Sequence, residues 1–380
     1  MNSRAPFASK SAMRSLCTLL AFAATTLADE ADEAFARELF SRLAAREGNV
    51  VCSPLSVRIA LAMAFGGARG TTAEEMGRVL RCDESVHAAF ARLVREYDGR
   101  DGRPALADAA WVKPGVTLLP PYLDLVRNHY GAVPTPLDFT ATDAACARIN
   151  GWVAERTHDR IREIVVPDML DANTTLVLVN ALHFKAAWED PFRERMTRPA
   201  PFTLVSGEKV EVPIMVRGEH FRYAEKDGAA AVELPYAGRR FSMVIVLPAA
   251  GAPATLPEGL LGSLKGKSVA VHLPRFKVES AFELAEVLQA MGMKSAFGGD
   301  ADFSGMNGKK DLFISAVAHK AFVAVDEEGT EAAAATSVRI QVKGAADKPV
   351  VFRADRPFLF LIRDGETGSI LFLGRVADPR

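Results

Sequence analysis

Side chains able to do catalytic chemistry occur in this sequence, but their spacing does not assemble them. His158, His183 and His319 lie far apart, and none has a nucleophile at a spacing that catalytic motifs use. Asp302 and Ser304 are two residues apart, a separation that suits a turn or a helix cap better than a catalytic pair. The chain has no GxSxG nucleophile elbow and no Walker or dinucleotide-binding fingerprint. The sequence therefore predicts a protein that is not an enzyme.

Sites for phosphate, cofactors or metals have little support either. The run Gly66–Gly70 follows an expected helix and lacks the Lys-Ser/Thr pair of a phosphate-binding loop, so a tight turn between helices is favoured. No CxxC, HExxH or His/Cys cluster is present in the sequence. We therefore expect neither a cofactor nor a bound metal.

One segment, residues 327–343, has a pattern unlike that of its surroundings. Its four alanines, 332–335, favour a helix by local propensity, but a period of two divides the segment into two faces. One face is small or apolar throughout: Thr330, Ala332, Ala334, Thr336, Val338, Ile340 and Val342. The other is polar, charged or small: Glu331, Ala333, Ala335, Ser337, Arg339, Gln341 and Lys343.

This alternation predicts a half-buried strand of about fourteen residues, roughly 46 Å long. The strand would begin after Gly329, which can act as a hinge, and end at the loop-like run 344–347. Small residues at its start suit a chain that must slide between close neighbours. A permanent long strand and an exposed loop are the alternatives that composition leaves open.

The remaining chain supplies helices first and strands later. Apolar spacing and end signals predict helices over 32–46, from Ser53-Pro54 to Gly66, from Thr72 (with Glu75 as a capping box), over 85–96 and over 143–157. Apolar runs predict strands over 176–184, 241–247, 269–272, 358–362 and 370–374. This order is typical of an α+β fold, and the absence of a boundary signal favours one domain over residues 29–380.

Composition excludes several classes of protein. Among 380 residues, Lys+Arg is 46 and Asp+Glu is 47, so the chain offers no basic field for nucleic acid. No apolar run reaches the ~18 residues needed to cross a membrane. Residues 1–28 combine basic residues, an apolar stretch and a small residue before Asp29, which predicts a secretory signal peptide rather than a buried helix. We therefore expect a secreted protein, exported to the periplasm or beyond if the host is bacterial.

Cysteine usage leaves the redox state open. Cys17 would leave with the signal peptide, and Cys52, Cys82 and Cys146 would remain. One disulfide with a spare thiol and three reduced, buried cysteines are both compatible with this odd number.

The segment 327–336 (EEGTEAAAAT) resembles the hinge of an inhibitory serpin almost residue for residue. The similarity extends along the chain through the runs 49–56 (NVVCSPLS), 180–185 (NALHFK), 313–321, 357–360 (PFLF) and 371–376 (LFLGRV). This resemblance implies a serpin fold with three β-sheets, about nine helices and an exposed reactive loop over about 327–350. It implies suicide inhibition of a serine protease: the loop is cut, an acyl-enzyme forms, and the freed loop inserts into the main sheet.

The resemblance also assigns roles to particular residues. The hinge would comprise Glu327, Gly329, Thr330, Glu331, Ala332, Ala333, Ala334, Ala335 and Thr336. The scissile bond, sixteen residues on from Glu327, would join Lys343 to Gly344, with Arg339 as the alternative. Lysine there implies a trypsin-like target. Ser53, Ser56, Asn180 and His319 would lie beneath the part of the sheet that opens.

Partners follow from the same comparison. We expect a monomer that forms a covalent complex with its target protease. The balanced charge and the lack of a long apolar run argue against a nucleic acid or a membrane as partner. We do not expect a glycosaminoglycan either, because Arg92 and Arg95 are offset by Glu96 and Asp98. A non-inhibitory serpin, acting as carrier or chaperone, and an inhibitor of cysteine proteases are the alternatives. Small residues at 330, 332 and 334 favour an inhibitor.

Overall fold

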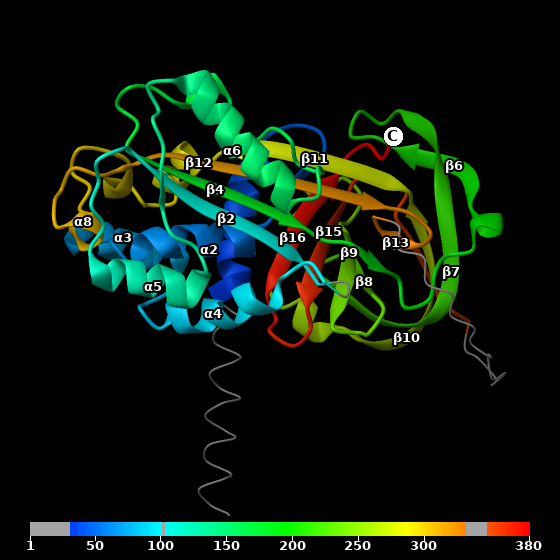
Figure 1. Ribbon diagram of the computed structural model, residues 1–380. Coiled ribbons are helices and arrows are strands. Elements are labelled where there is room, and N and C mark those ends of the chain that lie inside the picture. The colour runs from blue at the N-terminus through cyan, green and yellow to red at the C-terminus, as the bar shows by residue number, and fades with distance from the viewer. Residues whose placement is uncertain (1–30, 101–102, 332–347) are drawn as a thin grey trace, which may run out of the picture.

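The computed structural model describes residues 31–100, 103–331 and 348–380. The predicted signal peptide, residues 1–28, lies outside these ranges. Helices gather at one end of the molecule, long strands run out from beneath them, and a second group of strands fills the other end (Figure 1). The architecture is α+β, as predicted. Within the described ranges, no helix has the length and apolar character needed to span a bilayer.

Most helices come from the first half of the chain. Residues 31–43 form the first of them. It is followed by α2 (Pro54–Phe65), α3 (Gly70–Leu80), α4 (Val86–Glu96), α5 (Pro120–Tyr130) and α6 (Thr142–Arg156), and later by α7 (Ala285–Ala290) and α8 (Ser304–Asn307). Short 3-10 turns are η1 (Pro167–Met169), η2 (Glu194–Met196), η3 (Leu261–Ser263) and η4 (Ser295–Phe297).

The start of α2 matches its prediction, whereas the start of α3 does not. Ser53 is the N-cap of α2, its side chain accepts a hydrogen bond from the Ser56 amide, and proline opens the helix. The predicted capping box in α3 is wrong. The Thr72 hydroxyl instead accepts from the Asp302 amide at 3.0 Å, and Glu75 accepts from the Ser295 amide at 2.7 Å. Both side chains therefore form hydrogen bonds with residues distant in sequence and do not cap the helix.

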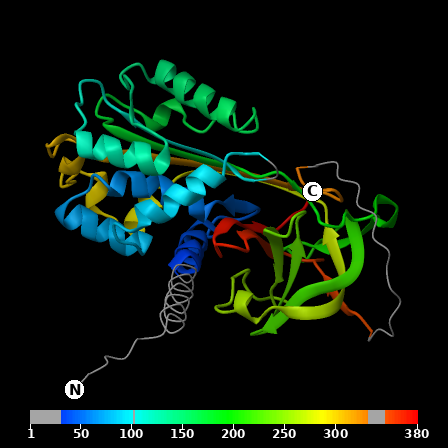
Figure 2. The same cartoon turned by 60° about the horizontal axis from the view of Figure 1, so that its bottom comes forward.

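A seven-stranded sheet within the described residues carries the residues of interest. Its order is β3 (Thr135–Pro136), β2 (Ala105–Val112), β4 (Leu176–His183), β12 (Ile314–Val325), β13 (Gly329–Thr330) and β5 (Ala186–Ala187), with β11 (Phe276–Glu283) beside β12. Strands β4 and β12 are parallel neighbours. Helix α6 covers one face of this sheet and α2 lies against the other (Figure 2). Coverage of both faces explains why β4 is apolar along nearly its whole length.

The remaining strands form one nine-stranded sheet among the described residues. Its order is β1 (Val50–Cys52), β16 (Ile370–Val376), β15 (Phe358–Asp364), β9 (Phe241–Leu247), β8 (Ala229–Pro235), β7 (Lys209–Lys226), β10 (Lys265–Pro274) and β14 (Val350–Arg353), with β6 (Arg198–Thr203) on β7. The resemblance implied three sheets. Two are joined here because β7, 18 residues long, pairs with β6 and β10 along much of its length and with β8 at its end.

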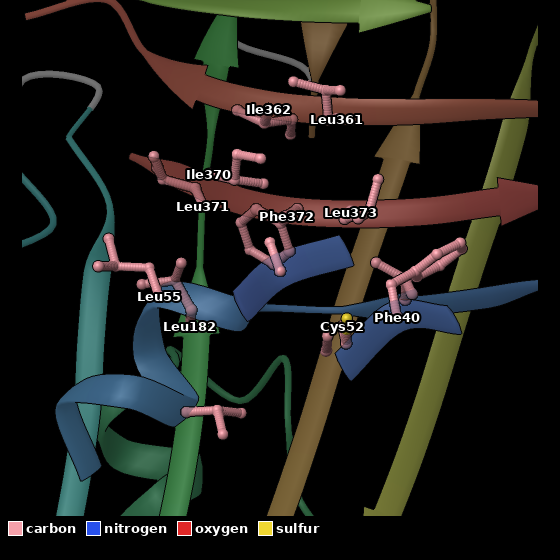
Figure 3. Close-up of a cluster of buried hydrophobic side chains, with 14 of the residues drawn as sticks. Phe40, Cys52, Leu55, Leu182, Leu361, Ile362, Ile370, Leu371, Phe372 and Leu373 are labelled. Carbon is pink, nitrogen blue, oxygen red and sulfur yellow. The ribbon is translucent and has the colours of Figure 1, made fainter. Parts of the chain in front are cut away.

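The hydrophobic core fills the space between the two sheets and α2. Figure 3 shows Leu371 of β16 near Leu55 of α2 and Leu182 of β4, with Leu373 farther along β16; all four side chains are fully or almost fully buried. Cys52 lies in the same cluster. Among the described residues, Cys52, Cys82 and Cys146 are free thiols, as in the reduced alternative, but only Cys52 and Cys146 are buried and Cys82 is partly exposed.

Candidate functional site: the start of the loop and the cluster beneath the sheet

The chain between β12 and β13 turns tightly around Asp326. The carboxylate of Asp326 accepts hydrogen bonds from the amides of Glu328 at 2.9 Å and Gly329 at 3.1 Å. Gly329 then passes so close to β5 that a Cβ atom on it would lie 2.2 Å from the carbonyl oxygen of Ala186. Only glycine fits there, so the hinge glycine is required by close packing of two backbones.

Glu327 is anchored where the loop begins. Its side chain is almost fully buried and lies 2.7 Å from the Arg275 guanidinium, and the Thr197 hydroxyl donates to it at 2.5 Å. Burial alone would raise the pKa of this carboxyl, but the hydrogen bonds from Arg275 and Thr197 outweigh burial and hold the pKa below its ordinary value. The sequence predictions included Glu327 but not its two partners.

Thr330 already occupies a position inside the seven-stranded sheet. Its backbone pairs antiparallel with Val325 of β12 and with Ala186 of β5. Its side chain is 1% exposed and shares a 2.5 Å hydrogen bond with the Tyr236 hydroxyl. The Tyr236 ring stacks on Trp188, with ring centroids 4.6 Å apart. A larger side chain at position 330 would therefore have to displace these described neighbours.

Four residues predicted to lie beneath the opening sheet are hydrogen-bonded together. All four are completely buried: Ser53, Ser56, Asn180 and His319. The Ser56 hydroxyl donates to Asn180 Oδ1 at 2.8 Å, and His319 Nδ1 lies 2.6 Å from the same oxygen. The Ser53 amide donates to His319 Nε2 at 3.0 Å. Nε2 is therefore the acceptor, so the proton of the neutral ring sits on Nδ1.

Asp108 is a fifth member of this cluster that sequence reasoning missed. It stands opposite Asn180 in the ladder between β2 and β4, and Asn180 donates to its carboxylate. His319 stands opposite Asn180 on the other side, so Asp108, Asn180 and His319 form one polar row across three strands. The sequence signal that could have identified it is a single acidic residue in the otherwise apolar run 105–112 (ALADAAWV).

Burial sets the protonation states in this row. It lowers the pKa of His319 from 6.5 to about 4, despite its hydrogen bond with Asn180, and raises the pKa of Asp108 well above 3.8, against the effect of the Asn180 hydrogen bond. Burial therefore favours the neutral form of both side chains. Both preferences keep charge out of the sheet.

The pKa of His319 predicts a pH dependence of stability. The folded protein resists protonation of this ring down to about pH 4, whereas the unfolded chain takes up the proton near 6.5. Stability that is present above pH 6.5 is therefore lost as the pH falls toward 4. Between pH 7.5 and 4.5 the loss is on the order of 2–3 kcal/mol. The free energy of unfolding in denaturant, compared between the wild type and His319→Gln at both pH values, measures it; an equal pH slope in both proteins would contradict the assignment.

Several predicted residues fall outside the described ranges. These are Ala332, Ala333, Ala334, Ala335 and Thr336 of the hinge, and Arg339, Lys343 and Gly344 at the proposed cleavage positions. Among the residues that the structure does describe, no group of three or more metal-ligating side chains is positioned to hold an ion.

Comparison with known proteins agrees with this geometry. The family model for serpins (serine protease inhibitors) matches residues 30–379. An uncharacterized serpin-like protein of Thermococcus kodakarensis is 41% identical over 363 residues, which cover 91% of this chain and 84% of that protein. The leukocyte elastase inhibitor of Equus caballus is 38% identical over 371 residues, which cover 91% of this chain and 97% of that protein.

A solved structure shows the same fold. The crystal structure of the serine protease inhibitor serpin-12 of Manduca sexta superposes with a TM-score of 0.81 at 30% identity, covering 92% of this chain and 98% of that one. The anchored hinge, the polar row across β2, β4 and β12, and these similarities lead to one conclusion: the chain belongs to the serpin family of serine protease inhibitors.

Proposed function

We propose that this serpin is a suicide inhibitor of trypsin-like serine proteases, cleaved after Lys343 and acting by insertion of the freed loop. The observation that carries the proposal is the position of Gly329 and Thr330. These two residues already pair between β5 and β12 in the antiparallel direction that an inserted strand needs. The sheet therefore presents a formed starting point for the rest of the loop.

The existing pairing would set the register of the proposed insertion. Because Thr330 stands opposite Val325, continuing the ladder would place Thr336 opposite His319 and Val338 opposite Val317. Side chains opposite each other in a ladder share a face. Thr336 would therefore enter the polar row, between His319 and Asn180.

Insertion requires β4 and β12 to separate along the stretch where they now pair, and the His319–Asn180 hydrogen bond must then break. A threonine hydroxyl between the two strands can donate to one of these side chains and accept from the other. The polar row would thus remain hydrogen-bonded after the sheet opens, which an apolar core would not require. This exchange supports a role for the cluster in sheet opening.

Displacement of the protease follows from the same register. Lys343 lies thirteen residues beyond Thr330, so complete insertion would place it about 43 Å from Thr330 along the sheet. A protease joined to Lys343 as an acyl-enzyme would move with it. When β4 and β12 separate, each strand exposes an edge of unpaired backbone groups. The inserted strand would form hydrogen bonds with both edges, which makes the movement favourable.

Substitution at the proposed cleavage position tests the specificity. Lys343→Glu should lower the rate of complex formation with trypsin by about a thousandfold, because an acidic specificity pocket repels the new carboxylate. The matched control is Lys348→Glu, which makes the same charge change on an exposed residue just beyond the proposed bond. The measurement is the rate of trypsin inhibition by each variant and by the wild type. Equal loss in both variants would contradict the assignment of Lys343.

We also propose that the signal peptide is removed and that residues 29–380 are exported. N-terminal sequencing of the exported protein tests this, and Asp29 is the expected first residue.

A further inference from the structure

Glu331 makes contacts unlike those of a solvated loop residue. Its side chain is 3% exposed, and its Oε2 atom lies 3.1 Å from Arg160 Nε and 2.9 Å from His183 Nε2. The other carboxylate oxygen, Oε1, is buried and has no hydrogen-bond partner among the described residues. A buried carboxylate with one free oxygen depends strongly on the groups that hold the other.

The backbone of Glu331 is also held in an unfavourable conformation. Its φ angle is +52°, in the left-handed region that glutamate seldom adopts. Its amide nevertheless donates to the Ala324 carbonyl at 3.0 Å, which continues the pairing with β12 by one residue. Strain of this kind persists only where surrounding contacts fix the residue in place.

The two partners come from different elements. His183 is the last residue of β4, and Arg160 follows α6, the helix that covers the outer face of the seven-stranded sheet (Figure 1). The neighbouring residues His158 and Asp159 also have positive φ angles, of 51° and 61°, so the chain bends sharply there. Glu331 is therefore tied both to the end of β4 and to the segment that follows α6.

We propose that Arg160 and His183 are positioning residues that clamp Glu331, and so hold the first residues of the loop in the sheet before any protease has cut it. This inference rests on the proposed function, because its consequence is for loop insertion. After cleavage, insertion competes with hydrolysis of the acyl-enzyme. Ordering the first residues of a strand has a large entropic cost. Because the clamp already orders them in the uncut protein, insertion after cleavage does not have to meet that cost.

Arg160→Ala is the variant that tests the clamp. The Arg160 side chain is 52% exposed, so its removal should leave the fold intact. The matched control is Arg162→Ala, which removes an arginine from the same segment, one paired with Asp159 at the exposed surface. Arg160→Lys keeps the positive charge beside Glu331 and should therefore behave much like the wild type.

Two quantities are measured on the full-length mature protein. Hydrogen exchange followed by mass spectrometry reports protection of the peptide that spans 326–331, where the Glu331 amide is hydrogen-bonded to Ala324. We expect about tenfold faster exchange in Arg160→Ala and no change in Arg162→Ala. Titration against trypsin reports the number of inhibitor molecules consumed per protease, which should rise by about two- to fivefold in Arg160→Ala only.

The results separate the clamp from the proposed function. Unchanged exchange in Arg160→Ala would overturn the clamp, whatever the wild type does to trypsin. Faster exchange with an unchanged titration would show a clamp without a role in insertion, which also overturns the inference. If the wild type traps no trypsin, the proposed function fails, and exchange alone then decides whether Arg160 holds the hinge.

Discussion

Thr330→Arg is expected to convert this inhibitor into a substrate. Thr330 is 1% exposed, and its hydroxyl is hydrogen-bonded to Tyr236, so an arginine here would bury its guanidinium where a threonine now packs. Burying an unpaired guanidinium costs several kcal/mol, and each ~1.4 kcal/mol changes an equilibrium tenfold. The hinge would leave the sheet and insertion would stall after cleavage. Covalent complex with trypsin should fall by about a hundredfold or more, while cleavage of the loop continues.

A denaturing gel distinguishes the two fates of the loop, because trapped protease migrates as a larger band and cleaved serpin as a smaller one. The control is Thr71→Arg, the same substitution on an exposed residue of α3. This control should trap as the wild type does. Undiminished trapping by Thr330→Arg would contradict insertion as the mechanism.

Glu327→Lys should destabilise the native protein and release the hinge. The substitution places an ammonium group beside Arg275, 2.7 Å from where the carboxylate now lies, and leaves the Thr197 hydroxyl without its acceptor. Breaking a buried ion pair costs about 3–5 kcal/mol, and we expect the lower end because Arg275 is 44% exposed. The melting temperature should fall by about 5 °C or more.

Release of the hinge should also favour insertion of one molecule's loop into another's opened sheet. Ladders of polymer on a native gel after mild heating would report it. Glu328→Lys is the matched control, since it reverses the neighbouring charge at an exposed position. The swapped pair, Glu327→Arg with Arg275→Glu, should recover part of the lost stability. A melting temperature for Glu327→Lys equal to that of Glu328→Lys would rule out the anchoring role.

Local signals predicted the elements better than they predicted the contacts between them. The Ser53-Pro54 start of α2 and the apolar run of β4 are determined by neighbouring residues and by burial on both faces, so both were predictable. The capping box of α3 failed because Thr72 and Glu75 bond instead to residues more than 200 positions away. Alternation in residues 327–343 indicated a strand, of which Gly329 and Thr330 are the part that the structure describes as paired.

In the candidate site, too, some residues could be predicted from the sequence and others could not. Ser53, Ser56, Asn180 and His319 were named through resemblance, and the structure brings them together. Their fifth partner was readable only as a lone acid in an apolar strand, Asp108. Arg275 and Arg160 carry no sequence signal, because an arginine in a polar segment is ordinarily a solvated surface residue. Only the fold shows that they reach the two glutamates at the start of the loop.

The central claim is that the loop is cut after Lys343 and then traps the protease. The most direct measurement is incubation of the mature protein with trypsin, followed by a denaturing gel and mass spectrometry of the products. The account predicts a detergent-resistant complex joined through Lys343 and loss of trypsin activity. Complete cleavage of the serpin with trypsin still fully active, at any ratio of the two proteins, would contradict it.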